Sequence, residues 1–458
     1  MEKIGIIGSG IGAYSIVSSI IELGIDAEIT VFELGSNSHS DAILFQDDDF
    51  DTDQFRSKVK LWPTHSVQIG GTSQLWHGVL GWHDNVDFTD SSSIFESYSD
   101  YLGYCEKIIN RFTKLPFAIN DLEKNEELFS FSEYFSDYLS PKPFLVLRRP
   151  IRVKSELKKF GVKVLHNTEV SEIFNSDSKV LISCRGMKER FVFSKVFICA
   201  GNFGSPKLVS RIIKKSLKLD FFDHPMGVIG TLMLNRYHKS EFHEEKHYSN
   251  RLNIKYGFTV RYQQKGKNFN IYFRPAFSSK SVQDTENLKL RLLGYRSGNM
   301  FNISAMLNLI SNIPLLLQVL SYKFLLKFPY KLYEVYVIND HDNLFGELSI
   351  NDSGSITDVM YPYSNESFKE ITTILTSIFG KRFSLNENFN FSSAAHLSGS
   401  LVNSKLLDKN NELLQINNVY ICDSSVLPFS GNVNSSLTLM AIGKKMIDNL
   451  YATNTSVR

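Results

Sequence analysis

The chain has 458 residues, of which 43% are hydrophobic and 21% charged, and its formal net charge at pH 7 is +2. This balance excludes wholesale disorder and a multi-span membrane protein. The near-neutral charge also excludes a broad basic surface for nucleic acid. The length is too great for one ordinary domain, so we expect two or three units.

The cysteines are few and far apart, with no C-x-x-C pair and no neighbouring histidine that would complete a metal site. They are Cys105, Cys184, Cys199 and Cys422. We interpret them as buried thiols in a reducing compartment and predict no metal. The sequence begins at once with a predicted strand and lacks the basic and apolar regions of a secretory signal, so we expect a cytoplasmic protein.

The hydrophobic pattern predicts several elements along the chain. Residues 3–33 contain an apolar strand at 4–7, a glycine turn, a helical run at 14–23 and a strand at 28–33, which together form half of a nucleotide-binding fold. A second α/β stretch has candidate strands at 162–165, 180–183 and 196–199. Residues 226–300 alternate as a sheet does, and a final helix is expected over 436–451.

The segment 305–332 is strongly apolar, but Pro314 and several polar residues interrupt it before it reaches membrane-spanning length. Lys323, Lys327 and Lys331 recur every four residues, which would place three cations on one helical face. Two interpretations remain open. The favoured one is a domain helix with its lysines in water, and the other is a helix lying on a membrane surface, which would give the protein peripheral membrane contact.

A glycine-rich turn, Gly8-Ser-Gly10-Ile-Gly-Ala13, follows the first strand and opens a helix. Gly8 permits the tight turn, Gly10 lets a pyrophosphate approach, and Ala13 allows close packing of helix and strand. Glu33 ends the second strand, where a carboxylate accepts hydrogen bonds from an adenosine ribose and repels a 2′-phosphate. The turn alone leaves FAD and NAD open and disfavours NADP.

Motifs near the end of the chain decide between these cofactors. They are a His-x-x-Gly-Ser element at 396–400, an Asp-x-Ser-x-x-Pro element at 423–428 and an Asn-x-x-x-Thr element at 434–438. Earlier landmarks stand at 70–78, 199–206 and 223–225. In this order they resemble the glucose–methanol–choline (GMC) family of FAD-dependent oxidoreductases, across about half of the chain.

The resemblance implies an α/β fold with a Rossmann-like FAD-binding domain and a smaller mixed-sheet substrate domain. The FAD-binding domain would be discontinuous, over residues 1–85, 146–225 and 390–458. Residues 86–145 and 226–389 would form the substrate domain. FAD is expected to be noncovalent, because the residue at the position of the family's linking histidine is Leu75, and the nearby His77 stands two residues further along.

The resemblance also implies the residues of the FAD site. Those expected at the ADP part, the flavin or the chain between them are Gly8, Ser9, Gly10, Ala13, Glu33, Gly71, Ser73, Val170, Ala200, Gly201, Asp423, Ser424 and Ser435. Val170 would reach adenine through its backbone, and Ala200 and Gly201 would line the pyrophosphate. Asp423 and the helix start at 434–435 would hold the ribityl chain and the pyrimidine edge.

By the same resemblance, His396 and Asn434 occupy the two catalytic positions that face flavin N5. Hydride transfer from an alcohol requires the hydroxyl proton to leave, and imidazole titrates near neutral pH, so His396 is the expected general base. The Asn434 amide can orient the hydroxyl and bind the developing oxyanion. Asn434 could instead be the N-cap of the final helix. His224 in Asp223-His-Pro is interpreted as structural.

The expected function is oxidation of an alcohol, such as a sugar, a polyol or another bulky or glycan-linked hydroxyl compound. Two alternatives stay open, a redox-silent lyase on the same FAD scaffold and an FAD-bearing binding subunit. The electron acceptor, whether oxygen, a quinone or a protein, is left open by the sequence. Residues 333–339 depart from the family's usual segment there, which leaves the substrate-loop geometry open.

Overall fold

The computed structural model describes residues 1–36, 67–75, 78–85, 88, 94–113, 117–120, 139–147, 150–176, 178–238, 254–264, 267–275, 330–340, 345–360, 365–386, 392–393, 396–427 and 433–452.

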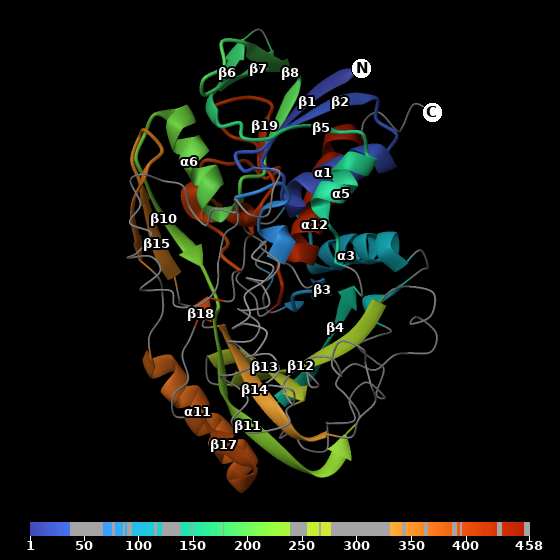
Figure 1. Cartoon of the computed structure of the whole chain (residues 1–458), viewed down its shortest axis with the longest axis vertical. Helices are drawn as coiled ribbons and strands as arrows, with labels where there is room; N and C mark the ends of the chain where they lie inside the picture. The colour runs from blue at the N-terminus through green and yellow to red at the C-terminus, as the bar shows by residue number, and fades with distance from the viewer. Residues whose placement is uncertain are drawn as a thin grey trace, which may run out of the picture.

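One part of the molecule is built on a five-stranded parallel sheet with strand order β19-β9-β1-β2-β5 (Figure 1). Its strands are β1 (Glu2–Ile7), β2 (Ala27–Phe32), β5 (Lys163–Leu165), β9 (Lys195–Ile198) and β19 (Val419–Ile421). The last four positions of β1 and β2 are buried, as strands covered on both faces require. The sheet therefore joins the beginning of the chain to its end, as the sequence predicts.

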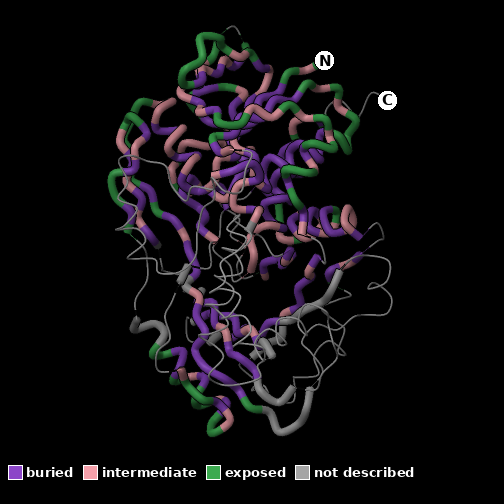
Figure 2. Tube along the Cα trace, viewed as in Figure 1, coloured by how far each residue is buried: buried purple, intermediate pink, exposed green. Residues whose placement is uncertain are grey.

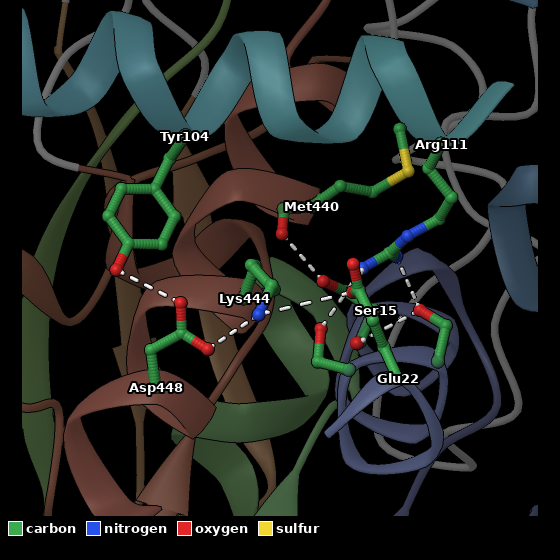
Figure 3. Close-up of polar contacts among 9 residues, drawn as sticks. Ser15, Glu22, Tyr104, Arg111, Met440, Lys444 and Asp448 are labelled. Carbon is green, nitrogen blue, oxygen red and sulfur yellow. Dashed lines mark hydrogen bonds and ion pairs between the residues drawn. The ribbon is translucent and has the colours of Figure 1, made fainter. Parts of the chain in front are cut away.

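Five helices accompany this sheet: α1 (Ile11–Glu22), α3 (Tyr98–Thr113), α5 (Val153–Lys159), α6 (Gly201–Ile213) and α12 (Ser436–Tyr451). The first and last helices pack side by side, and Ser15 of α1 donates a hydrogen bond to the backbone oxygen of Met440 in α12 at 2.6 Å. Figure 3 shows the polar contacts that join α1, α3 and α12. The strands and helices expected at the two ends of the chain are confirmed.

Two small antiparallel sheets adjoin this part. The first contains β6 (Val170–Ser176), β7 (Lys179–Cys184) and β8 (Arg190–Phe193). The second contains β10 (Leu217–Phe222), β15 (Phe345–Ile350) and β16 (Ile356–Met360). The four cysteines are reduced and buried, as the sequence analysis expected.

The other part of the molecule is an eight-stranded sheet, with order β17-β11-β14-β13-β12-β4-β3 and β18 paired to β11. Its strands are β3 (Val79–Leu80), β4 (Leu139–Leu147), β11 (Pro225–His238), β12 (Ile254–Gln264), β13 (Lys267–Pro275), β14 (Tyr330–Asp340), β17 (Phe383–Leu385) and β18 (Ser392–Ser393). Every described pair in it is antiparallel, whereas a mixed sheet was expected. The α/β fold of GMC type is otherwise confirmed.

The two faces of the eight-stranded sheet differ in polarity because successive side chains point to opposite sides. One face packs against α11 (Asn365–Phe379), seen beside the sheet in Figure 1, and forms an apolar core that includes Val260, Ile271 and Val335. The residues between these positions, such as Arg261 and Asn270, belong to the other face. Both are polar and buried, with 3% and 1% exposure, so this face forms the wall of an interior site.

The larger apolar core lies around the parallel sheet, where Figure 2 colours most of the trace as buried. It also takes in α3 and the strands β15 and β16, through residues such as Tyr101 and Leu348. The domain bounds expected from the sequence stay a proposal. These elements nevertheless pack in the first core, although they lie inside the ranges assigned to the substrate domain.

Residues 305–329 of the apolar segment lie outside the described residues. Residues 330–332 begin strand β14, so Lys331 belongs to a strand, and the expectation that it shares a helical face with Lys323 and Lys327 is wrong. The reason is the alternation of Tyr, Val and Ile with polar residues over 330–340, which is a strand pattern. No helix among the described residues is long and apolar enough to span a membrane.

Candidate active site

The glycine turn after β1 has the geometry that a phosphate site needs. Gly8 has a φ of +90°, and a Cβ there would meet the backbone oxygen of Cys199 at 2.3 Å, so only glycine fits. A Cβ on Gly10 would meet nothing within 4 Å, and the first turn of α1 carries no acidic residue. The first turn of α1 therefore carries no acidic side chain of its own that would repel an anion.

Ser9 joins three of the sequence motifs. Its backbone N–H and its hydroxyl both donate to Glu33 Oε2, at 3.0 and 2.5 Å, and its Oγ accepts from the backbone N–H of Gly70 at 2.7 Å. Gly35 N donates to the other oxygen of Glu33 at 2.8 Å. Burial raises the pKa of the Glu33 carboxyl, although these hydrogen bonds oppose that rise. Because a carboxylate offers about four acceptor sites, one remains for a ribose hydroxyl.

A second phosphate-type turn follows β9, the strand next to β1. Ala200 stands at the N-cap of α6, and Gly201 has a φ of +84° with open space where a Cβ would be. Asp423, at the end of β19, accepts from the Gly201 N–H at 2.9 Å and from the Ser205 hydroxyl. Its other oxygen accepts from the N–H and hydroxyl of Ser425 at 2.9 and 2.6 Å.

Asp423 thus has all four acceptor sites filled by protein donors, and burial raises its pKa. Its carboxylate organises the turn at Gly201 and the short 3-10 helix Ser424–Val426. That the same carboxylate also holds the ribityl chain stays a prediction.

The remaining expected cofactor residues lie around these turns. Gly71 and Ser73 belong to a 3-10 helix, Gly71–Leu75, in which the Ser73 hydroxyl donates to the backbone oxygen of Gly70. Ala13 is buried in α1, Val170 is the buried first residue of β6, and Ser435 is the N-cap of α12. His77 lies outside the described residues.

These observations meet the requirements of a dinucleotide site. The turns after β1, β9 and β19 leave the same edge of one parallel sheet, since parallel strands end together. Two of them open helices with no acidic first turn, and both have open space at a glycine. The residues present therefore fit FAD.

The structure also brings the two expected catalytic residues together. The Asn434 side chain lies close enough to the His396 imidazole to raise its pKa through a hydrogen-bonding interaction. His396 Nδ1 is buried and has no hydrogen-bond partner among the described residues. Ser435 is the N-cap of α12, and no side chain caps that helix, so the alternative of Asn434 as its N-cap is wrong.

Two further histidines stand close to His396. The rings of His224 and His396 are 6.0 Å apart and nearly perpendicular. Burial lowers the pKa of His396 to about 3, with further lowering by the charges that His224 and His83 can carry, while the bond to Asn434 opposes the shift. The imidazole of His396 is therefore neutral at physiological pH. His224, interpreted from sequence as structural, lies beside the catalytic position and contributes to its electrostatics.

His83 is a site residue that sequence reasoning missed. Its backbone N–H donates to the Tyr101 hydroxyl and its backbone oxygen accepts from the Tyr98 hydroxyl, both at 3.0 Å. Tyr101 also bonds Thr438, in the first turn of α12, at 2.9 Å. Helix α3 thus ties the His83 segment to the helix that follows Asn434. No local pattern around Trp82-His83 signals this, because the contact depends on three distant segments.

A pocket lies between Asn434 and the polar face of the eight-stranded sheet. Trp82 and Asp84 line it from the segment after β3, and Lys142 and Phe144 from β4. Asn434 therefore presents its backbone or side chain to the same space as the substrate-domain wall. Further lining residues come from β12 and β13 and include Thr259, Arg261, Asn270 and Tyr272.

The arrangement is that of a two-part α/β protein: a parallel sheet carries glycine turns that fit a dinucleotide, and an antiparallel sheet lines a pocket that Asn434 also lines. Residues 381–443 match the family model described as GMC oxidoreductase. A search of curated protein sequences gives no match.

Solved structures match over the full length. They include pyridoxine 4-oxidase from Mesorbium loti, at 12% identity over 99% of both chains with a TM-score of 0.57. A variant of formate oxidase from Aspergillus oryzae RIB40 matches at 11% identity over 100% of this chain and 99% of that chain, with a TM-score of 0.56. A fungal aryl-alcohol oxidase matches at 11% identity over 99% of both chains, with a TM-score of 0.54.

At such identities these likenesses concern the fold. The family match covers residues 381–443, so the similarity to GMC oxidoreductases is carried by that segment and by the fold.

Proposed function

We propose that the chain binds FAD noncovalently and oxidises the CH–OH group of an alcohol, with His396 as general base and Asn434 as the residue that orients the hydroxyl. The observation that carries the proposal is the proximity of the His396 and Asn434 side chains, which come from two distant segments, with Asn434 lining the pocket. The matched structures are oxidases of pyridoxine, of formate and of aryl alcohols by name, which supports a small organic substrate. A sugar or another bulky hydroxyl compound remains within this class.

Bound FAD would supply the two-electron acceptor that takes the hydride from the carbinol carbon. The turns at Gly8–Gly10 and Ala200–Gly201 would hold its pyrophosphate, and Glu33 its ribose.

His396 would take the hydroxyl proton as the carbonyl forms. Burial favours the neutral ring, which is the form that can accept a proton, although a pKa of about 3 also makes it a weaker base than an imidazole that titrates near neutral pH. The Asn434 side chain raises that pKa, so it favours the protonated ring that the reaction creates. Asn434 therefore has two roles, positioning the substrate hydroxyl and stabilising the imidazolium.

The test is anaerobic mixing of the purified flavoprotein with a panel of alcohols, followed by the absorbance of the flavin. At least one alcohol should bleach the wild-type flavin. His396→Asn should slow that bleaching by about 100-fold to 10,000-fold, the usual contribution of a general base. Asn434→Ala should slow it by about 100-fold.

His166→Asn is the matched control, because His166 is exposed on the connection between β5 and β6. A wild-type flavin that no alcohol bleaches would contradict the proposal. Product formed without flavin reduction would favour the lyase instead.

A further inference from the structure

The pocket opposite Asn434 contains an unequal group of charges. Asp84 accepts from Lys142 Nζ through Oδ1 and from Arg261 Nη1 through Oδ2, so each carboxylate oxygen serves one cation. All three residues line the pocket, and they come from the segment after β3, from β4 and from β12. Two cations share one anion, which leaves a net charge of +1 among these three.

The group is rigid at one end and accessible at the other. Arg261 has 3% of its side chain exposed, and Asn268 Oδ1 accepts from its Nε at 2.8 Å. Asp84 has 15% exposed and Lys142 has 30%. Lys142 is therefore the cation that a molecule entering the pocket meets with the least rearrangement.

Among the described residues that line the pocket, Asp84 is the one carboxylate. Glu334 belongs to the same face of the sheet but lies on β14, beyond β13, and does not line the pocket. The second cation of the group, Lys142, lies at its accessible side.

Aromatic side chains form part of the other walls of the pocket. Trp82, Phe144 and Tyr272 line it together with the charged group. Burial raises the pKa of the Tyr272 hydroxyl to about 12, so this side chain is neutral and adds no negative charge. Flat apolar walls beside a net positive charge match a ligand with an apolar or aromatic body and one anionic group.

We propose that the substrate of this enzyme is an alcohol that carries a single anionic group, a carboxylate in the simplest case, and that Lys142 and Arg261 select it. This inference rests on the proposed function for the reaction, and it adds the substrate class. Lys142 is the specificity-determining residue open to test, because it is partly exposed and its removal leaves Asp84 paired with Arg261.

The experiment measures binding of benzoate and of benzamide to the purified flavoprotein by calorimetry at low ionic strength. The two probes have the same shape and differ by one charge. Benzoate should bind about tenfold more tightly, the scale of one partly desolvated charge contact. Lys142→Met should remove most of that preference, and Lys142→Arg should keep it.

Lys409→Met is the matched control, because it makes the same charge change at an exposed position that does not line the pocket. It should leave the preference for benzoate unchanged. Equal binding of the two probes by the wild type, no binding of benzoate, or an unchanged preference in Lys142→Met would each overturn the proposal.

A second arm separates this inference from the proposed function. Flavin bleaching is compared for 4-(hydroxymethyl)benzoate and 4-(hydroxymethyl)benzamide, and the acid should react faster, with Lys142→Met reducing the difference. If benzoate binds through Lys142 but no alcohol bleaches the flavin, the anion site stands and alcohol oxidation fails. If alcohols bleach the flavin without preference for the acid, the oxidation stands and the anionic substrate fails.

Discussion

His396 illustrates how a site alters the chemistry of a single residue. An imidazole in water titrates near pH 6.5, but burial and two nearby histidines lower the pKa of this one to about 3. The folded protein therefore holds the ring neutral at pH values where the unfolded chain would protonate it. This difference in proton uptake makes stability depend on pH.

The sign of that dependence follows from the direction of the shift. Between about pH 6.5 and 3 the unfolded state binds the additional proton, so stability is lost as the pH falls through this window. When the pH is lowered from 7.5 to 5, the neutral His396 should reduce the free energy of unfolding of the wild type by up to about 2 kcal/mol. Urea denaturation at the two pH values should show that His396→Asn loses less stability on acidification than the wild type does.

His166→Asn, at an exposed position, controls for the loss of one histidine. It should lose as much stability on acidification as the wild type does. If His396→Asn and the wild type lost the same stability, the ring would not be neutral and buried in the folded state.

The sequence predicts that His396 and Asn434 belong to one site, but it does not predict the surroundings of these two residues. His396 and Asn434 each stand in a short motif with its own spacing, which is visible without a structure. His83 and His224 reach the site through chain folding, one held by Tyr98 and Tyr101 and the other by the turn before β11. No periodicity encodes the proximity of such residues, so only coordinates bring them together.

Among the elements, the first and last helices are joined by a polar cluster at their contact with α3 (Figure 3). Lys444 of α12 has only 7% of its side chain exposed, and its Nζ lies 2.5 Å from Asp448 and 3.9 Å from Glu22 of α1. Asp448 also accepts from the Tyr104 hydroxyl of α3 at 3.1 Å. A cation this buried depends on its partners, because unpaired charges are costly away from water.

Asp448→Ala should therefore destabilise the protein by about 3 kcal/mol, since it leaves Lys444 with only the more distant Glu22. The measurement is the free energy of unfolding in urea. Lys159→Met is the control, because it breaks the pair with Glu156 at a lysine that is 67% exposed, and such a pair contributes less than about 1 kcal/mol. Equal costs for the two changes would mean that the Lys444 pair is solvated rather than buried.

The sequence predicts a helix or strand correctly where the spacing of its apolar residues fits only one of the two. The final helix runs over 436–451 as expected, because its apolar residues recur at helical spacing beside α1 and α3. The helix expected over 305–332 is wrong for residues 330–332, because the lysine spacing fits a helix but strand β14 begins at Tyr330. Where the helical and the strand period both fit a segment, its pairing with neighbouring strands determines which element forms. Here those neighbours are β11 and β13, and a single sequence does not reveal that pairing.

For the whole molecule, the turns that would hold FAD lie between residue 8 and residue 435, all around the core of the parallel sheet. The second core, between the antiparallel sheet and α11, contains none of the expected cofactor residues. A ligand stabilises the part of a protein that binds it, so FAD should protect the first core more than the second.

Calorimetry of the protein with and without FAD tests this coupling. With FAD a thousandfold above its dissociation constant, the first core should gain about 4 kcal/mol. That gain corresponds to a rise of roughly 8 °C or more in its melting temperature. Without FAD the trace should broaden or split, because the second core keeps its own melting temperature.

Gly10→Val provides the matched variant, because Gly10 has a φ of −76° and open space at its Cβ position, so valine fits the fold and fills the place of the pyrophosphate. Its melting should resemble that of the FAD-free wild type, and added FAD should leave it unchanged. Gly103→Val, on α3 with equally open space around it, controls for the new side chain and should still respond to FAD. A single transition that FAD does not move, in the wild type, would contradict a cofactor site built from both ends of the chain.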